Sequence, residues 1–553
     1  MSKKATYVSL ILSLLLFLNC GEKMINKKAS KNYVKDQLNK LAPVTIAPDL
    51  SYLPAKERHV IKLLVRASQH IDDIFLDQVY KKNDQILNEL KKSPQSNQPY
   101  IDLFTIMFGP WNRLENNKPF INDTEKPPGV NYYPLDMTKE DFNNWLNENP
   151  EDKESFESHY TVIRNKNDKL VAVPYSKEYS SQLKSAADLL KQAAEETRDP
   201  SLREFLNKRA EAFLSNDYYE SNMIWMDLSG DIEVVIGPYE VYEDRLFGYK
   251  AAFESFVCVV DHEESKNLHT IGTYLDKMED NLPIPDKHKN FERGASSPIK
   301  VVNEIFTAGD TKAGVQTLAF NLPNDERVRE AKGSKKVMLK NVMQAKFEKI
   351  LTPIASEVLS PDELDNLSFD AYFKHILMHE VSHGLGPGNI TLDGKETSVS
   401  KELKDHYSII EECKADVLGI YNVLYLIEED VLDDELSGTL FSTNLAGMFR
   451  SIRFGIEEAH GGANAIQLNY YLEKNAVTID DDGLFSVNSR NYRRAVRDLA
   501  EKTLMIEAEG DYGEAEKFIE EYAVLKPEVK VALSKLSDIP VDIRPEYTIE
   551  NEL

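Results

Sequence analysis

The chain has 553 residues, with 92 acidic and 66 basic side chains and a formal net charge of −26. Single hydrophobic cores stop growing at roughly 250–300 residues, so a chain of this length should form at least two lobes. The negative charge repels phosphate backbones and argues against a nucleic-acid partner.

Residues 1–20 predict an export signal rather than part of the fold. Lys3 and Lys4 precede an apolar run over residues 8–18, which is too short to span a bilayer as a mature helix. The run ends at Cys20 in a pattern that resembles a bacterial lipoprotein signal, in which the cysteine becomes the lipidated first residue. A plain secretory signal is the alternative, because Asn19 stands where a small residue is usual. We expect an exported bacterial protein, anchored by lipid as a periplasmic or outer-membrane lipoprotein.

Three stretches of different character follow this signal. Residues 32–213 have a helical pattern, whereas residues 218–260 contain β-branched and aromatic runs that predict strands of a small sheet or barrel. Residues 371–518 have a mostly helical pattern. The proline-bearing tail from Leu525 predicts irregular or extended chain that packs back on the first lobe.

Cysteine content and hydropathy limit the remaining possibilities. Cys258 and Cys413 are too few for a disulfide framework in an exported protein of this size. Both lie in apolar or helical runs, so we predict that they are small core residues. No other segment approaches the ~18 uninterrupted apolar residues of a membrane-spanning helix, so membrane contact is expected only through a lipid anchor at Cys20.

An H-E-x-x-H motif lies within a predicted helix over residues 371–384, where apolar residues recur at helical spacing. His379 and His383 are at positions i and i+4, so one helix face presents both imidazoles to a single point, with Glu380 beside them. Gly384 and the glycine-proline run after it end the helix. The spacing predicts a metal site. A buried helix with two hydrogen-bonded histidines is the alternative.

A zinc site of this kind needs a third protein ligand and leaves a fourth position to water. Glu412 lies 29 residues after His383 on a second predicted amphipathic helix, and Asp416 lies one turn further along the same face. Buried carboxylates are costly without a cation or a hydrogen-bond partner. We therefore predict that Glu412 binds zinc, while Asp416 or Glu411 accepts the free ring N–H of a ligand histidine. A solvated acidic helix face is the alternative.

Together these segments resemble the dipeptidyl peptidase III family of zinc exopeptidases. The resemblance rests first on H-E-V-S-H-G-L-G-P at residues 379–387 and E-E-C-K-A-D at residues 411–416. Three further stretches resemble the family's E-x-Y segment, its N-x-P-N motif and its helical histidine: residues 240–242, 321–324 and 460. All of these matches follow the family's order, from about residue 220 to residue 470.

One departure from the family pattern concerns the spacer within the metal motif. The better-known members carry three residues between the glutamate and the second histidine, whereas this chain has only Val381 and Ser382. The shorter spacer fits a regular helical turn, while the longer one needs a bulge. Metal binding is therefore expected in this bacterial form, while its activity and metal preference are open.

The resemblance implies roles for individual residues. It implies one zinc ion per chain, with Glu380 as the general base that takes the proton of the attacking water. Tyr242 and His460 would hydrogen-bond the oxyanion that develops. Three residues would hold the ammonium group of the substrate: Glu240, Asn321 and Asn324. The implied activity is the release of dipeptides from the free N-terminus of oligopeptides.

The resemblance also implies an α+β fold with two lobes around a wide cleft, one mostly helical and zinc-bearing, the other mixed with a small β-barrel. We assign residues 21–265 to the barrel-containing lobe, with residues 310–345 and the tail 525–553 packing on it. Residues 266–309 and 346–524 form the helical, zinc-bearing lobe. Two other functions are compatible with the motifs: another zinc aminopeptidase or endopeptidase, and a catalytically silent peptide-binding lipoprotein.

Overall fold

The structure is a computed structural model, and it describes residues 25–167, 169–291 and 298–553. The predicted signal, including Cys20, lies outside the described residues. The chain divides into two compact units, each discontinuous in sequence. Unit 1 contains the described residues up to Leu38 together with Asp73–Val173 and Val241–Ala252. Unit 2 contains Asn39–Asp72, Pro174–Glu240 and Phe253–Leu553.

Unit 1 consists of helices and two short hairpins around an aromatic core. Its helices are α2 (Lys31–Asn39), α4 (Asn83–Lys91), α5 (Pro94–Met107), α6 (Lys139–Glu148) and α7 (Lys153–Glu157). Its hairpins are β2 (Trp111–Asn112) with β3 (Lys118–Pro119), and β4 (Thr161–Lys166) with β5 (Lys169–Pro174). The ring of Phe142 lies 4.4 Å from that of Phe247 and 5.7 Å from that of Phe156, which places these aromatic side chains in one cluster.

Unit 2 contains a five-stranded sheet with the order β6-β7-β8-β10-β9. The strands are β6 (Ile232–Glu240), β7 (Ala252–Val260), β8 (Ile299–Gly309), β9 (Ala319–Leu322) and β10 (Lys335–Leu339). All residues of β7 are buried, as expected of a central strand with an almost continuous apolar run. The pairing of β8 with β10 is parallel, whereas β9 pairs antiparallel with β10 and forms one edge.

The sheet differs from the sequence-based expectation in two ways. Among the described strands, β6 and β9 are not hydrogen-bonded to each other, so the sheet is open and the predicted closed barrel is not found. In addition, Ile299–Gly309 forms the middle strand β8, whereas we assigned residues 266–309 to the helical lobe. The apolar, β-branched character of this run explains its place between β7 and β10. The other lobe boundaries stay predictions.

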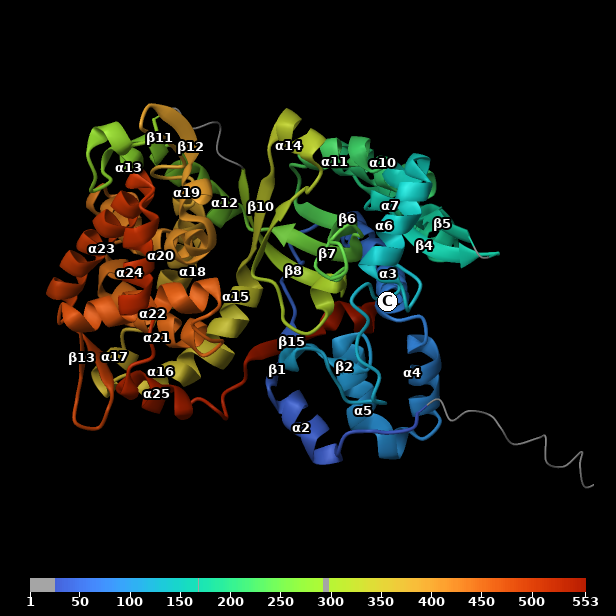
Figure 1. Cartoon of the computed structure of the whole chain (residues 1–553), viewed down its shortest axis with the longest axis horizontal. Helices are drawn as coiled ribbons and strands as arrows, with labels where there is room; N and C mark the ends of the chain where they lie inside the picture. Colours follow the sequence, from blue (N-terminus) through green and yellow to red (C-terminus); the bar gives the residue numbers. More distant parts are fainter. Residues whose placement is uncertain (1–24, 168, 292–297) are drawn as a thin grey trace, which may run out of the picture. The chain divides into compact units, whose positions relative to one another are not determined.

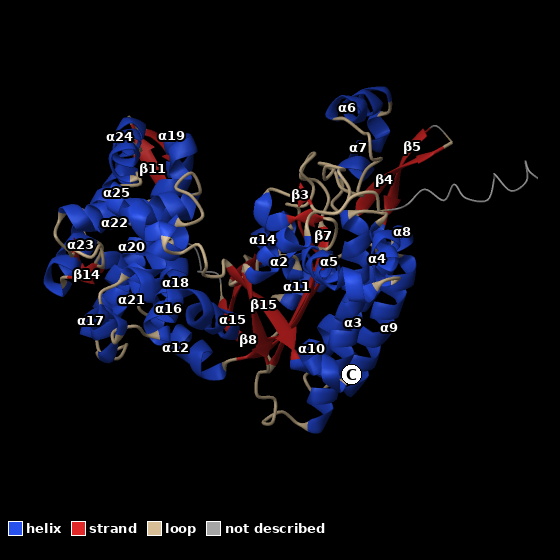
Figure 2. Ribbon diagram, turned by 90° about the horizontal axis from the view of Figure 1, so that it is seen from below, coloured by secondary structure: helices blue, strands red, loops and turns tan. Residues whose placement is uncertain are grey.

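The rest of unit 2 is mainly helical. Helices α18 (Phe369–Ser382), α20 (Tyr407–Glu428), α21 (Glu435–Ile452), α22 (Ala459–Glu473) and α23 (Ser489–Glu509) gather in one group (Figures 1 and 2). Within it, α18 packs on α20 and α21, and α20 packs on α22 and α23. The hairpins of unit 2 are β11 (Asn389–Leu392) with β12 (Lys395–Ser398), and β13 (Val477–Ile479) with β14 (Phe485–Val487).

Helix α3 (Ala55–Val79) has residues in both units, and the remaining helices belong to unit 2. They are α8 (Tyr175–Glu178), α9 (Ser180–Glu196), α10 (Pro200–Ser215), α11 (Tyr219–Trp225), α12 (His262–Gly272), α13 (Leu275–Asp280), α14 (Glu326–Lys332), α15 (Lys340–Lys346), α16 (Thr352–Val358), α17 (Pro361–Leu364), α19 (Val399–Leu403), α24 (Tyr512–Tyr522) and α25 (Pro527–Ser534).

The C-terminal tail is more regular than its prolines suggest. It forms α25, and then β15 (Asp542–Tyr547), which pairs in parallel with β1 (Leu41–Ile46). Pro527 occupies the first turn of α25, where its missing N–H costs nothing, so proline here starts a helix rather than preventing one.

The cysteines and the apolar character of the helices can be compared with the sequence-based expectations. Cys258 and Cys413 are free and buried, which confirms that they are core residues. None of the helices in the described ranges combines the length and the apolar character that crossing a membrane requires.

Candidate metal centre

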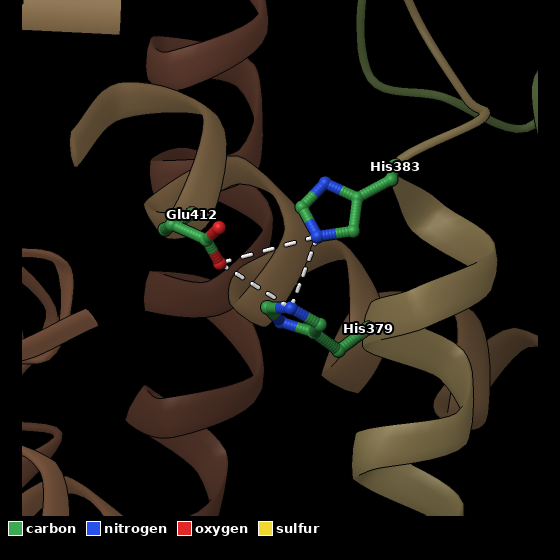
Figure 3. Close-up of side chains that lie close together, drawn as sticks. All are labelled: His379, His383 and Glu412. Atoms are coloured by element: carbon green, nitrogen blue, oxygen red, sulfur yellow. Dashed lines mark hydrogen bonds and ion pairs between the residues drawn. The ribbon is translucent and has the colours of Figure 1, made fainter. Parts of the chain in front are cut away.

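Three side chains from two helices of unit 2 point toward one another (Figure 3). His379 and His383 come from the end of α18, and Glu412 comes from α20. Their candidate ligand atoms all lie within 4.8 Å of one another. The Nε2 atoms of the two histidines are 3.1 Å apart, and Glu412 Oε2 lies 3.4 Å from Nε2 of His379. The structure thus brings together the three predicted metal ligands.

Helix α18 positions both histidines because it stays regular through the motif. The Ser368 side chain accepts a hydrogen bond from the backbone N–H of Ala371 and so begins the helix. At the other end, the backbone N–H of His383 donates to the carbonyl oxygen of His379 at 3.3 Å, which is the ordinary helical bond. A two-residue spacer therefore aligns both rings without a bulge.

Each of the two histidine rings contacts a carboxylate through Nδ1, the ring nitrogen that faces away from the candidate metal site. Nδ1 of His379 lies 2.7 Å from Oδ1 of Asp416, and Nδ1 of His383 lies 2.8 Å from Oε1 of Glu411. The sequence left the choice between these two carboxylates open, and each of them in fact contacts one histidine. The second oxygen of Asp416, Oδ2, accepts hydrogen bonds from two side chains of α22: Asn464 and Gln467.

These contacts leave three ligand atoms that a cation could bind. In the neutral imidazoles, the ring nitrogen that donates to a carboxylate carries the proton, so the Nε2 atoms of His379 and His383 then present lone pairs. Two lone pairs 3.1 Å apart cannot hydrogen-bond each other. The Oε2 atom of Glu412 is buried and makes no hydrogen bond. A divalent ion bound by two imidazoles and one carboxylate would satisfy all three atoms, which is the donor set of a zinc site with an open position.

The close contacts between these side chains shift the pKa values of two candidate metal ligands. Burial raises the pKa of Glu412, but the nearby imidazoles of His379 and His460 outweigh it and hold the pKa well below its usual range. Burial lowers the pKa of His379, but the Asp416 and Glu412 carboxylates outweigh it and raise the pKa to about 10. His379 would have to release that proton to bind a cation, so metal binding is coupled to proton release.

Glu380 forms an ion pair with Lys336, a residue of β10 that no sequence motif indicated. The Lys336 ammonium also lies 3.3 Å from the backbone oxygen of Glu380. Burial raises the pKa of Glu380, but Lys336 and the histidines outweigh it and lower the pKa below its usual value. Glu380 is therefore held as a carboxylate, the form that a general base needs.

His460 lies on the other side of Glu412, near the start of α22. Its Nδ1 atom is 3.1 Å from Oε2 of Glu412, and this contact raises the pKa of the imidazole. His460, His379 and Glu380 share the wall of a cavity of about 620 Å³. The side chain of Glu458 accepts a hydrogen bond from the backbone of Gly461 and so fixes the start of this helix.

The predicted ammonium-binding residues lie at one end of the sheet. Nδ2 of Asn324 donates to Oε1 of Glu240 at 3.3 Å and to the backbone oxygen of Tyr239 at 3.2 Å. Asn321 is exposed on the edge strand β9. Tyr242 belongs to unit 1 and is 79 % exposed, and its part in catalysis stays a prediction.

Sequence comparisons find one peptidase family and several relatives. A model of peptidase family M49 matches residues 136–392. The chain is 36 % identical to Nudix hydrolase 3 of Arabidopsis thaliana, over 96 % of this chain and 76 % of that protein. It is 25 % identical to dipeptidyl peptidase 3 of Dictyostelium discoideum, over 64 % of this chain and 58 % of that protein.

Two solved structures are also similar over nearly their whole length. The dipeptidyl peptidase III of Caldithrix abyssi superposes with a TM-score of 0.91 at 55 % identity, covering 94 % of this chain and 99 % of that one. The enzyme of Corallococcus sp. strain EGB superposes with a TM-score of 0.77 at 42 % identity, covering 95 % and 99 %. The family resemblance seen in the sequence is thus confirmed, and the chain belongs to the dipeptidyl peptidase III family of metallopeptidases, peptidase family M49.

Proposed function

We propose that the protein is a zinc-dependent exopeptidase that releases dipeptides from the free N-terminus of oligopeptides. The observation that carries the proposal is the cluster of His379, His383 and Glu412 with Glu380 beside it, in a member of a peptidase family. The solved structures that the chain resembles are dipeptidyl peptidases III, which supports the same activity here.

His379, His383 and Glu412 would hold the zinc ion, which when bound supplies Lewis-acid chemistry by making a water more acidic and polarising the scissile carbonyl. Glu380, held as a carboxylate by Lys336, accepts the proton of the attacking water and delivers it to the leaving amine. His460 reaches the same cavity and can donate a hydrogen bond to the oxyanion. We assign Tyr242 the same task from the family resemblance.

An enzyme that cleaves after the second residue of a peptide must hold the substrate's ammonium group at fixed acceptors. The Asn324 amide donates through Nδ2, so its Oδ1 atom is left to accept, next to the Glu240 carboxylate. Burial raises the pKa of Glu240, and an ammonium group bound there would offset that cost. A charge-assisted hydrogen bond of this kind contributes roughly 1.5–3 kcal/mol, which is enough to reject peptides with a blocked amine.

The edge strand β9 supplies a path for the peptide backbone. One side of β9 is bonded to β10, and its other side pairs with no described strand. An extended peptide can add to such an edge through main-chain hydrogen bonds. Asn321 lies on this strand and would contact the peptide directly.

We further propose that the protein has two lobes around a wide cleft that close over the peptide, as the family resemblance implies. Small-angle scattering of the Glu380→Ala protein should show a smaller radius of gyration when peptide is added. An unchanged radius would contradict closure.

The experiment that tests the proposed activity combines metal analysis with peptide cleavage. Stoichiometric zinc and dipeptide release from a dipeptidyl naphthylamide and from free, but not N-blocked, peptides would support it. Release of single amino acids would indicate an aminopeptidase, and cleavage of N-blocked peptides would indicate an endopeptidase. Bound zinc without turnover on any of these substrates would favour a silent peptide-binding lipoprotein.

We also propose that the protein is exported and anchored through Cys20, on the basis of the sequence before residue 21. The protein should then incorporate radiolabelled fatty acid and fractionate with membranes, and Cys20→Ser should abolish both. Labelling that persists in this variant would contradict the anchor.

A further inference from the structure

The cavity beside the metal centre extends well beyond the ligands. Its walls include parts of α18, α21 and α22, residues 315–319 before and at the start of β9, and residues 541–542 at the start of β15. Val315 and Phe454, which are 54 % and 51 % exposed, line it as well. A volume of about 620 Å³ is more than the metal ligands and a water need, so it leaves room for part of a substrate.

The two basic side chains that line this cavity, Lys346 and Arg450, differ in their partners. Lys346 is fully buried, lies 2.8 Å from Oδ1 of Asp542 and donates to the backbone oxygen of Gln316 at 2.6 Å. Arg450, on α21, makes no hydrogen bond or ion pair with any residue in the described part of the chain, and its Nε atom is buried without a partner. A buried N–H donor without an acceptor is costly, and an oxygen atom of a ligand would satisfy it.

None of the acidic residues of the cavity wall forms an ion pair with Arg450, and each contacts another group. Asp542 pairs with Lys346, Glu380 pairs with Lys336, and Asp416 accepts from His379. Glu458 accepts from the backbone of α22. Arg450 is therefore the cation without a counter-charge among the described residues that line the cavity.

The order of sites along β9 shows which part of a peptide would reach Arg450. Asn321 on β9 is paired with Lys336 on β10, and Lys336 contacts Glu380, so the general base lies near the level of Asn321. Asn324, with its contact to Glu240, follows the end of β9. From Asn324 toward lower residue numbers along β9, the ammonium site therefore comes first and the general base second.

Residues 315–319, which line the cavity with Arg450, come next in that direction. A peptide whose ammonium group is held at Glu240 and whose scissile bond lies by Glu380 would place its remaining residues there. This argument rests on the proposed dipeptide release, because the amine site sets the direction of the peptide.

We propose that Arg450 determines specificity by binding a carboxylate on the part of the substrate that follows the scissile bond. Guanidinium groups bind carboxylates through paired N–H donors, which gives both affinity and direction. The carboxylate is supplied either by the C-terminus of a short peptide or by an acidic side chain. The preferred substrates are then short or acidic peptides rather than long neutral ones.

The test measures binding in a zinc-loaded protein that carries Glu380→Ala, so that peptides stay intact. Calorimetry compares three ligands: tetra-alanine with a free C-terminus, tetra-alanine amide, and the tetrapeptide amide Ala-Ala-Asp-Ala. We expect a ligand that carries the recognised carboxylate to bind about tenfold to a hundredfold more tightly than tetra-alanine amide, as a charge-assisted hydrogen bond predicts. The free acid shows this gain if the C-terminus is the source, and the aspartyl amide shows it if an acidic side chain is the source.

Substitutions then identify Arg450 as the group responsible. Arg450→Gln should bring the affinity ratio between the carboxylate-bearing ligand and tetra-alanine amide close to one, and Arg450→Lys should keep part of it. Arg490→Gln, which removes an exposed arginine of α23, is the matched control and should keep the full ratio. If Arg450→Gln does not fold, the ratio in the unsubstituted background should still fall as salt is raised.

Two results would overturn the proposal: equal affinities for all three ligands in the unsubstituted background, or a preference for the carboxylate-bearing ligand that persists in Arg450→Gln. Cleavage of tetra-alanine by the protein with Glu380 intact separates this failure from that of the proposed function. Dipeptide release without discrimination among the three ligands overturns only the role of Arg450. Absence of dipeptide release overturns the proposed function and leaves the direction of the peptide without support.

Discussion

At the scale of single residues, substitutions of two glutamates on neighbouring helices should separate metal binding from hydrolysis. Glu380→Ala should keep stoichiometric zinc and lower kcat by about 10²–10⁴-fold, because it removes the base and no ligand. Glu412→Ala should lose both zinc and activity, because it removes a ligand. Metal analysis beside the dipeptide-release assay checks both outcomes. Loss of zinc from Glu380→Ala would show that Glu380 is a ligand instead.

The ion pair between Lys336 and Glu380 should be visible in the pH dependence of catalysis. Lys336 lowers the pKa of Glu380 against the effect of burial, so Lys336→Met should raise that pKa. The carboxylate is the active form, and the acid limb of the kcat/KM profile should therefore move to higher pH in the variant. Lys349→Met removes an exposed lysine and should leave the limb in place. An acid limb that does not move would contradict the role of Lys336.

The residues of the metal centre could be predicted to different extents. His379 and His383 were predictable because two residues one helical turn apart face the same way whatever the rest of the chain does. Glu412 was predictable from a carboxylate in an otherwise apolar helix. Lys336 was not, because its position depends on how β10 packs against α18, and no local pattern encodes that contact. Arg450 was missed for the same reason.

At the scale of elements, the close approach of α20 to α18 holds the ligands together. A methyl group on Gly419 would lie 3.1 Å from the backbone nitrogen of His379 and 3.2 Å from the backbone oxygen of His375. Backbone atoms cannot rotate away, so Gly419→Ala should push the helices apart. We expect a loss of about 1–3 kcal/mol in the free energy of unfolding and a drop of about tenfold in zinc affinity.

A matched control for this substitution lies on α21. A methyl group on Gly438 would meet no atom within 4 Å, so Gly438→Ala should be neutral or stabilise the helix by up to about 1 kcal/mol. Urea denaturation and competition with a chelator measure the two quantities. A Gly419→Ala protein with unchanged zinc affinity would show that the helix spacing does not control the metal site.

The elements themselves were predictable where their residues carry a strong local pattern. β6 and β7 lie in the stretch read as strands, and α18 to α23 lie in the stretch read as helices. The strand β8 was missed although its residues are apolar and β-branched, because the family expectation placed that segment in the helical lobe. The small barrel is not confirmed, and the reason is related: strand composition indicates a sheet but does not fix which edges meet.

At the scale of the whole molecule, a buried charge cluster in unit 1 should make stability depend on pH. Arg113 donates two hydrogen bonds of 3.0 Å to Glu243, and Lys126 lies 2.5 Å from the same carboxylate. Burial raises the pKa of Glu243, but the two cations outweigh it and hold the pKa well below its usual range. The stabilisation is complete above the ordinary glutamate pKa and is lost as pH falls through it toward the lowered value.

Glu243→Gln should therefore cost about 3–5 kcal/mol near neutral pH and flatten the loss of stability between about pH 5 and pH 3. Denaturation followed by tryptophan fluorescence at several pH values measures this, since Trp111 and Trp145 lie in unit 1. Glu151→Gln, at an exposed position of the same unit, should change neither quantity. A variant whose stability falls with acid as steeply as that of the unsubstituted protein would contradict the assignment.

The parallel pairing of β1 with β15 joins segments about 500 residues apart in sequence. Until residues 542–547 emerge from the ribosome, β1 has an unpaired edge, the kind of surface that recruits other strands. Lys346, which lies 2.8 Å from Asp542, is likewise left as a buried charge without its partner. A chain released early would therefore expose an unpaired strand edge and would lack the Asp542 partner of the Lys346 ammonium group. Synthesis of β15 therefore completes the pairing of β1 and supplies the partner of Lys346 in unit 2.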